Sequence, residues 1–90
     1  MQINHLITMA NQIGDFFKSF PDTAQAKKDI AQHISRFWAL GMREQILKHA
    51  LEKNGEGLED IVQAAIREHL NNKEVKLHLA AAEAEHYHGQ

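Results

Sequence analysis

The stretch INHLITMANQIGDFFKSFPD, residues 3–22, decides the fold because its apolar and polar side chains separate completely at the helical period. Each helical residue is rotated by about 100° from the one before it, so residues spaced three and four apart share one side. That side carries Ile3, Leu6, Ile7, Met9, Ala10, Ile13, Phe16, Phe17 and Phe20. Pro21 ends the pattern, because proline removes a backbone donor and disfavours helical geometry before it. The stretch therefore predicts an amphipathic helix over residues 3–20, followed by a turn.

Three further helices are expected over residues 23–40, 42–53 and 58–70, where apolar residues again recur at helical spacing. Asp22 or Thr23 can cap the first of these, and Gly41 is expected to stop it. The sequence NGEG, residues 54–57, ends the next one. After residue 71 the pattern weakens, which favours a loosely docked or free helix over residues 73–86 and a disordered end.

The sequence thus predicts an all-α fold, a small bundle of four helices plus a weak C-terminal fifth helix. Residues 1–71 are expected to form the helical domain and residues 72–90 a C-terminal extension that is helical or partly disordered. No internal repeat and no long strand-like alternation opposes this prediction.

Composition excludes several classes of function. The 90 residues contain no cysteine, so this chain alone is expected to hold no iron–sulfur cluster, thiolate zinc site or redox centre. The net charge of −2 arises from 10 basic and 12 acidic residues mixed along the chain, unlike the clustered basic face that binds nucleic acid. No apolar run reaches the ~20 residues of a membrane span, and the N-terminus lacks a signal-peptide pattern. We expect a soluble, cytoplasmic protein that binds neither nucleic acid nor membranes.

No catalytic, cofactor-binding or metal-binding residues are expected. The seven histidines include no pair at the i,i+4 spacing that places two ligands on one helix face. His69 falls on the apolar side of the fourth helix, where a histidine is more often a hydrogen-bonded structural residue than a general base. Asp15, Asp22, Asp29 and Glu44 lie on polar helix faces or at helix starts, where capping and solvation explain them.

The amount of apolar surface indicates a protein-binding role. The first helix presents an apolar arc of about 180°, wider than the roughly 100° that a surface helix normally turns towards a core. Phe37 and Trp38 point about 100° apart on their helix, so a small core takes one of them more easily than both. The other becomes an interface anchor. The alternative is that the helices cover all of this surface, with Trp38 in the core.

The polar residues inside MANQIGDFF, residues 9–17, have two expected roles. Gly14 lies at the edge of the apolar arc, where the missing side chain lets a neighbouring backbone approach closely. Asn11, Gln12 and Asp15 form a polar, nearly uncharged strip on the other face, which suits contact with another protein. The predicted partner-binding residues are therefore Phe37, Trp38, Met42, Asn11, Gln12 and Asp15.

Several segments, taken in order, carry a resemblance to one family. They are HLITMANQIGDFF (5–17), PD (21–22), IAQHISRFW (30–38), MR (42–43), H-x-L (49–51), GEGL (55–58) and IVQAAI (61–66). Over residues 5–70 the chain resembles the delta subunit of cytoplasmic NAD-dependent formate dehydrogenases, which are multi-subunit molybdenum or tungsten enzymes. Family members usually carry an acidic residue, a proline and a basic residue where this chain has Ala39-Leu40-Gly41. A glycine turn is therefore expected here in place of a proline turn.

The resemblance implies an accessory, non-catalytic subunit. In that family the alpha subunit holds the bis-molybdopterin guanine dinucleotide cofactor and oxidises formate, while the beta and gamma subunits pass electrons through FMN and iron–sulfur clusters to NAD. The delta subunit is associated with assembly and stability of the complex. The resemblance thus implies that this chain binds the catalytic alpha subunit and other subunits, and supports the cofactor-loaded form without a cofactor of its own.

Other functions stay open from the sequence. A chaperone that handles the molybdopterin cofactor transiently would bind that cofactor in isolation. A small helical regulatory or interaction protein that contacts nucleic acid would bind it in a salt-dependent way. An uncovered apolar patch would also let the isolated chain form a homodimer.

Overall fold

A computed structural model describes residues 1–70, and within them every regular element is a helix. The elements are α1 (Ile3–Phe17), α2 (Thr23–Phe37), α3 (Leu40–Glu52) and α4 (Asp60–Ala65), which continues into a π-helical turn at Ile66–Leu70. The predicted all-α bundle of four helices is confirmed. The expected fifth helix over residues 73–86 and the extension over residues 72–90 lie outside the described residues.

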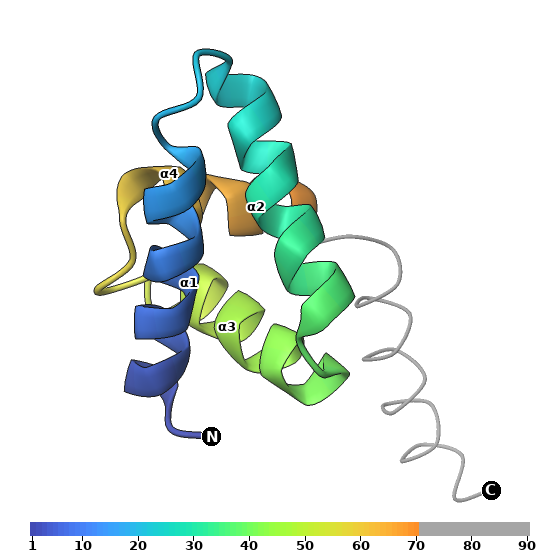
Figure 1. The fold of residues 1–90 in the computed structure, drawn as a ribbon. Coiled ribbons are helices and arrows are strands. Elements are labelled where there is room, and N and C mark those ends of the chain that lie inside the picture. Colours follow the sequence, from blue (N-terminus) through green and yellow to red (C-terminus); the bar gives the residue numbers. More distant parts are fainter. Residues whose placement is uncertain (71–90) are drawn as a thin grey trace, which may run out of the picture.

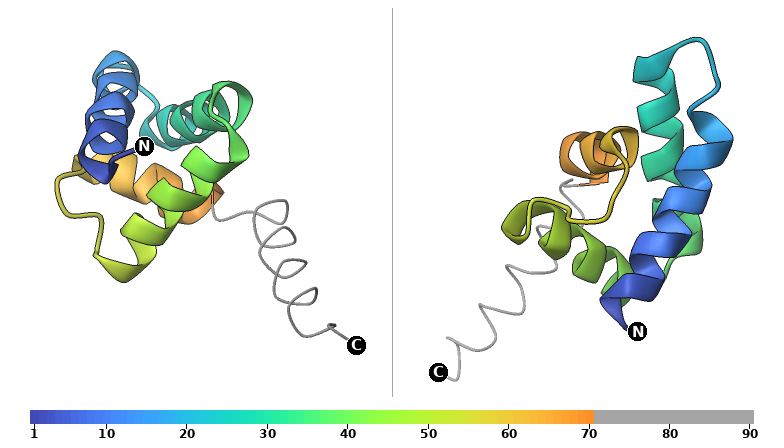
Figure 2. Two further views of the ribbon diagram at one scale, coloured as in Figure 1. Left: turned by 90° about the horizontal axis from the view of Figure 1, so that it is seen from below. Right: turned by 90° about the vertical axis from the view of Figure 1, so that its left-hand side faces the viewer.

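The four helices form two layers. α1 and α2 run antiparallel, side by side, and α3, α4 and the π-helical turn lie behind them (Figure 1). The two further views separate these layers, with α1 and α2 on one side of the core and the later elements on the other (Figure 2). One face of α1 and α2 therefore packs inward, while the opposite face has no layer over it among residues 1–70.

Twelve buried residues from all four helices, the π-helical turn and the α2–α3 junction make one apolar core between the layers. They are Leu6, Ala10, Ile30, Ile34, Trp38, Ile46, Leu47, Ala50, Val62, Ala65, Ile66 and Leu70. No polar or charged residue is buried among the described residues. Burial of apolar surface at about 25 cal/mol per Å² is thus the force that holds these elements together.

The turn between α1 and α2 starts earlier than expected. α1 ends at Phe17 rather than at residue 20, and the N–H of Phe20 donates to the carbonyl of Phe17 at 3.0 Å in a turn that precedes Pro21. Asp22 then caps α2, because its carboxylate accepts a hydrogen bond from the N–H of Gln25 at 3.1 Å.

The turn between α2 and α3 corrects two expectations. α2 ends at Phe37 rather than at residue 40, and the chain turns through two extended residues, Trp38 (φ −92°, ψ 141°) and Ala39 (φ −61°, ψ 152°). Gly41 lies inside the first turn of α3, and its φ is not positive. Gly41 therefore neither stops α2 nor makes a glycine turn, because two extended residues reverse the chain without left-handed geometry.

The loop between α3 and α4 follows the predicted glycine pattern. Asn54, Gly55 and Gly57 all have positive φ, at 54°, 63° and 90°, and the N–H of Gly55 donates to the carbonyl of His49 at 3.1 Å. Glycine adopts this left-handed geometry without a Cβ clash, so the segment 54–57 ends α3 as expected. α4 begins at Asp60, two residues later than predicted.

Gly14 lies where α1 meets α4. It is buried, and a methyl group added there would overlap the Cγ2 atom of Val62. A close approach at Gly14 was expected, but the neighbour is the side chain of Val62 rather than a backbone. The missing side chain lets α4 insert a core residue against α1.

Candidate functional site

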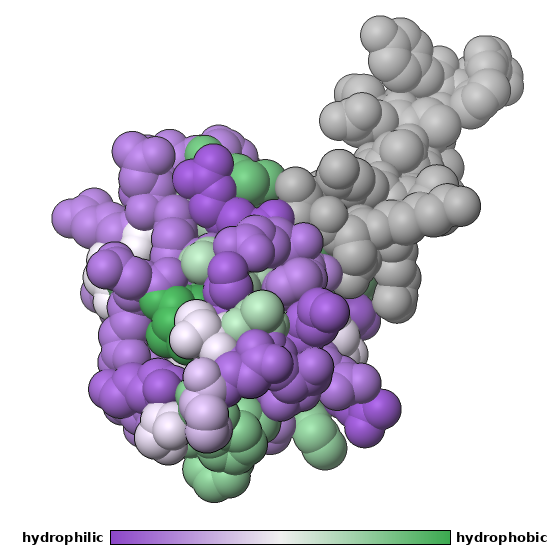
Figure 3. All heavy atoms as spheres, turned by 90° about the horizontal axis from the view of Figure 1, so that it is seen from above, coloured by the Kyte–Doolittle hydropathy of each residue, from purple (hydrophilic) through white to green (hydrophobic). Residues whose placement is uncertain are grey.

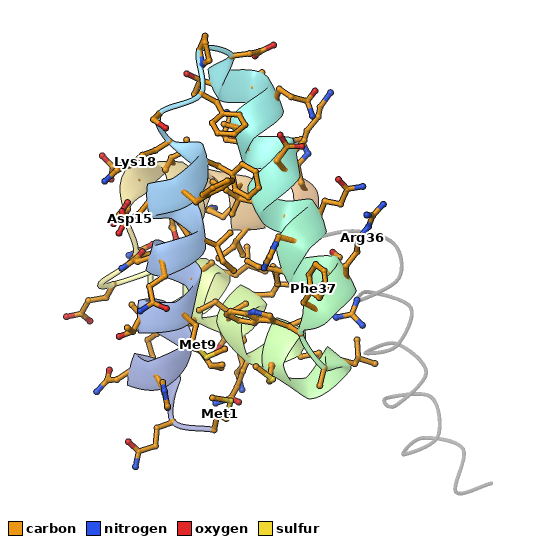
Figure 4. All side chains as sticks on the ribbon, in the orientation of Figure 1. Met1, Met9, Asp15, Lys18, Arg36 and Phe37 are labelled. Carbon is orange, nitrogen blue, oxygen red and sulfur yellow. The ribbon has the colours of Figure 1, made fainter. Side chains whose placement is uncertain are left out.

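An open, mainly apolar groove runs between α1 and α2, on the face that no other part of residues 1–70 covers. Its volume is about 470 Å³. α1 supplies Met9, Gln12, Ile13, Phe16 and Phe17, while α2 and its C-cap supply His33 and Trp38. We call this feature the α1–α2 groove. In Figure 4, Met9 lies on its α1 side and Phe37 on its α2 side, with further side chains between the two helices.

Exposed aromatic rings continue the groove in both directions. The ring of Phe16 on α1 lies 5.7 Å from that of Phe20 in the turn after α1, and on α2 the ring of His33 lies 4.7 Å from that of Phe37. Phe16 is 65% exposed, Phe20 42% and Phe37 72%. Seen from the end that carries the α1–α2 turn, apolar residues gather at the lower edge of the view, on the side of α1 and α2 (Figure 3). Groove and rings together form an apolar surface of the kind that marks interaction sites.

Phe37 and Trp38 take opposite positions, and the backbone decides which is buried. Phe37 is the last helical residue of α2 and projects outward, whereas extended geometry at Trp38 turns its indole into the core, where it is 6% exposed. Trp38 also lines the α1–α2 groove. A partner can therefore enclose Phe37 directly, while Trp38 supports the groove from below.

Asn11 makes its hydrogen bonds within the chain. Its side-chain amide donates to the carbonyl of Gly57 at 2.9 Å, and its carbonyl oxygen accepts from the N–H of Glu59 at 2.9 Å. Glu59 is the N-cap residue of α4. Asn11 thus joins α1 to the start of α4 and satisfies a backbone donor that would otherwise lack a partner. Its predicted hydrogen bonds to a partner would require these two bonds to break.

Asp15 lies one helical turn further along, in a small charged cluster with Lys18 and Glu59. The Nζ atom of Lys18 lies 2.9 Å from Asp15 and 3.8 Å from Glu59. The hydrogen bond from Lys18, supported by one with Glu59, holds the pKa of Asp15 below its usual value. The hydrogen bond with Asp15, followed by burial, raises the pKa of Glu59. Asp15 and Lys18 lie on the outer side of α1, away from α2 (Figure 4).

The remaining predicted residues divide between surface and core. Gln12 is exposed and is the one polar α1 residue that lines the α1–α2 groove. Met42 is half-buried and packs against the core from the first turn of α3. The structure therefore brings Gln12 and Phe37 to the same side of the molecule, and separates them from Asn11 and Asp15 on the α4 side of α1.

Sequence reasoning did not select Phe16, Phe20 or His33 as site residues. The unusual width of the apolar arc predicted over residues 3–20 could have indicated Phe16 and Phe20. A residue at the edge of such a wide arc cannot pack into the core. His33 offered no signal, since its contact with Phe37 depends on the α2 backbone.

The histidines and carboxylates of residues 1–70 do not assemble into a metal site. No three His, Cys, Asp or Glu side chains in this part cluster as metal ligands would. His69 is half-buried in the π-helical turn. None of the helices in this part combines the length and hydropathy needed to span a membrane.

Comparison with known families gives a clear result. The family described as NADH-dependent formate dehydrogenase delta subunit FdsD matches residues 5–66, more than half of the chain. The chain belongs to this delta-subunit family. The matched residues include all of α2, α3 and α4 and most of α1, so they contain the α1–α2 groove with Phe16, Phe20 and Phe37. Searches of curated proteins and of solved structures find no match to the chain.

Membership of the delta-subunit family identifies the chain as one component of a multi-subunit enzyme, which implies partner subunits. The resemblance implies an acidic residue, a proline and a basic residue in relatives, where this chain has Ala39-Leu40-Gly41. Leu40 is the first residue of α3 in this structure. Proline is favoured at that helical position, so the geometry here also suits the residue expected in relatives.

Proposed function

We propose that this chain is a non-catalytic accessory subunit that binds the catalytic alpha subunit of an NAD-dependent formate dehydrogenase and supports assembly of its cofactor-loaded form. The observation that carries the proposal is the α1–α2 groove with its exposed phenylalanines, which is open among the described residues. It lies inside the region matched to the delta-subunit family. A subunit that stabilises another protein needs such a surface, whereas an enzyme needs reactive groups brought together.

Burial of this surface supplies the driving force in the proposed complex. A phenylalanine side chain buries roughly 150–250 Å² when enclosed, and each Å² contributes about 25 cal/mol before association costs are subtracted. Phe16 and Phe37 are both more than half exposed, so most of their surface is available for this contact. Binding to the folded, cofactor-loaded form alone would stabilise that form by mass action.

Phe37 is the main anchor in this proposal and lies towards one end of the groove, with Phe16 towards the other end and Gln12 between them (Figure 1). Trp38 and Met42 act from beneath, because they hold the α2–α3 turn that presents Phe37. Asn11 and Asp15 serve the α1–α4 contact instead, since their polar groups are engaged there.

The proposal assigns no cofactor to this chain. The molybdopterin cofactor, the iron–sulfur clusters, FMN and NAD would all be held by other subunits of the complex, which we expect to act in the cytoplasm. A chain with no cysteine is compatible with that division of labour.

Co-expression with the alpha subunit tests the function. We expect the full-length chain to co-purify with the alpha subunit and to raise its melting temperature and the fraction that carries cofactor. The proposal is wrong if the alpha subunit loads cofactor equally well without this chain and if the chain does not co-purify with the alpha subunit. Binding of free molybdopterin cofactor by the isolated chain would favour the chaperone alternative.

A further inference from the structure

The exposed side of α2 carries two parallel strips of different chemistry. His33 and Phe37 form the strip beside the α1–α2 groove. Lys28, Gln32 and Arg36, spaced four residues apart, are all exposed and form the neighbouring strip. We call the second one the basic strip. Arg36 projects on the outer side of α2, away from α1, and Phe37 lies nearer the groove (Figure 4).

The two basic ends of this strip have no acidic partner within residues 1–70. The ion pairs of this part involve Lys18 and Lys27 but neither Lys28 nor Arg36. Asp29 lies next to Lys28 in sequence, but its carboxylate accepts a hydrogen bond from Gln25 at 3.0 Å. Within residues 1–70, Arg36 thus presents an unpaired positive charge near the Phe37 end of the groove. Lys28 lies about 140° round α2 from His33, on the side away from the groove.

We infer that the α1–α2 groove and Arg36 beside it together dock one amphipathic helix of the catalytic subunit, with large apolar residues along one face and a carboxylate at the end that meets Arg36. This inference rests on the proposed function. Two antiparallel helices present parallel ridges, so a helix laid between them packs along its length. The groove residues on α1 run from Met9 to Phe17, eight residues or about 12 Å, which matches two to three turns of such a helix.

The position of Arg36 specifies the partner further. Arg36 immediately precedes Phe37, the last helical residue of α2. A carboxylate on the docked helix at the level of Phe37 would reach it. Electrostatic complementarity of this kind sets orientation and register more than affinity.

A second copy of this chain fits the surface less well. A symmetric contact centred on the groove would bring both copies of His33 and Arg36 into one interface. The residues that line the groove include no acidic side chain to neutralise them. The charge pattern therefore favours a different, acidic partner.

The test compares matched variants of the full-length chain in binding to the catalytic subunit. We expect Phe37→Ala to weaken binding about tenfold or more, as loss of a main aromatic anchor does. The variant Arg36→Glu should weaken binding several-fold in low salt, and this loss should shrink near 0.5 M salt, where the Debye length is roughly 4 Å. Leu51→Ala and Lys48→Glu on α3 are the controls, since both residues are exposed there, and binding should stay within about twofold.

The outcomes separate the inference from the function on which it rests. If the wild-type chain binds but the α2 variants behave like the α3 controls, the docking inference is wrong and the proposed function stands. If the wild-type chain does not bind, both are wrong. If the isolated chain dimerises, and Phe37→Ala abolishes the dimer without affecting binding to the catalytic subunit, a second copy occupies the groove and the inference is overturned.

Discussion

Phe37 and Trp38 are neighbours in the chain, yet Phe37 is 72% exposed and Trp38 is 6% exposed. The difference arises at the end of α2, where the helix stops at Phe37 and the extended backbone of Trp38 redirects its side chain inward. One residue therefore offers an anchor to a partner, and the next closes the core beneath the α1–α2 groove.

This relationship predicts opposite effects on stability. Trp38→Ala should lower the free energy of unfolding by about 3–5 kcal/mol, because it leaves a cavity in the core. Phe37→Ala should change it by less than about 0.5 kcal/mol, because little of its surface is buried. Urea denaturation of the isolated chain measures both, and equal losses would contradict the division between core and surface.

Asn11 and Gln12 provide a second neighbouring pair. Asn11→Ala should cost about 1–2 kcal/mol, since it removes two hydrogen bonds and leaves the N–H of Glu59 without its partner. Gln12→Ala is the matched control and should stay within about 0.5 kcal/mol, because Gln12 is exposed. Thermal unfolding of the two variants gives the comparison. A larger loss for Gln12→Ala would show that the wrong amide is assigned to the α1–α4 contact.

Replacing Gly14 and Gly41 by alanine should change the stability of the protein in opposite directions. Gly14→Ala should destabilise by about 1–3 kcal/mol, because the new methyl group overlaps Val62. Gly41→Ala should stabilise by about 0.5–1 kcal/mol, because Gly41 is helical and nothing lies within 4 Å of the position of the new Cβ atom. Melting temperatures check both signs. Destabilisation by Gly41→Ala would instead support the glycine stop that the sequence suggested.

The charged cluster predicts two carboxyl titrations displaced in opposite directions. The pKa of Asp15 lies below its usual 3.8, chiefly through the hydrogen bond from Lys18, and the pKa of Glu59 lies above 4.5, chiefly through the hydrogen bond with Asp15. Lys18→Met should raise both pKa values, since Lys18 lowers both, and Lys48→Met should leave them unchanged. Carbon-13 NMR titration of the side-chain carboxyls measures this directly.

These shifts also fix the sign of the pH dependence. The depressed pKa of Asp15 gives a contribution to stability that is present above pH 3.8 and lost as the pH falls through the folded-state pKa. The raised pKa of Glu59 acts oppositely, so its contribution is present below pH 4.5 and lost as the pH rises through the folded-state pKa. The two partly cancel, and both are weak in this exposed setting. A steep change in stability caused by Lys18→Met above pH 6 would contradict this account.

Much of the fold could be predicted because its signals are local. The apolar spacing in α1 and in α4, the cap at Asp22 and the glycines of the α3–α4 loop each act within a few residues. The end of α2 could not be predicted in this way. The helical spacing of apolar residues continues past Phe37, so the sequence favours a longer α2. The helix stops there because Trp38 packs into a core formed with α1 and α3, which are distant in sequence.

The candidate site was predicted less well for the same reason. The sequence indicated an excess of apolar surface and named Phe37, and the structure leaves that residue exposed. It also grouped Asn11 with Gln12 as one polar strip, whereas Asn11 faces the start of α4 and Gln12 faces the α1–α2 groove. Residues 100° apart on a helix meet different neighbours, and periodicity alone does not say which neighbours those are.

The amino-acid sequence by itself determined the helical class, the order of the four helices and membership of the delta-subunit family, because periodicity, capping and motif order all depend on local residue types. Only the tertiary structure decided which apolar residues became core and which remained outside. That choice depends on how four short helices divide a limited interior. The chain buries Trp38 and Val62, and it leaves Phe16 and Phe37 on the surface proposed to meet the catalytic subunit.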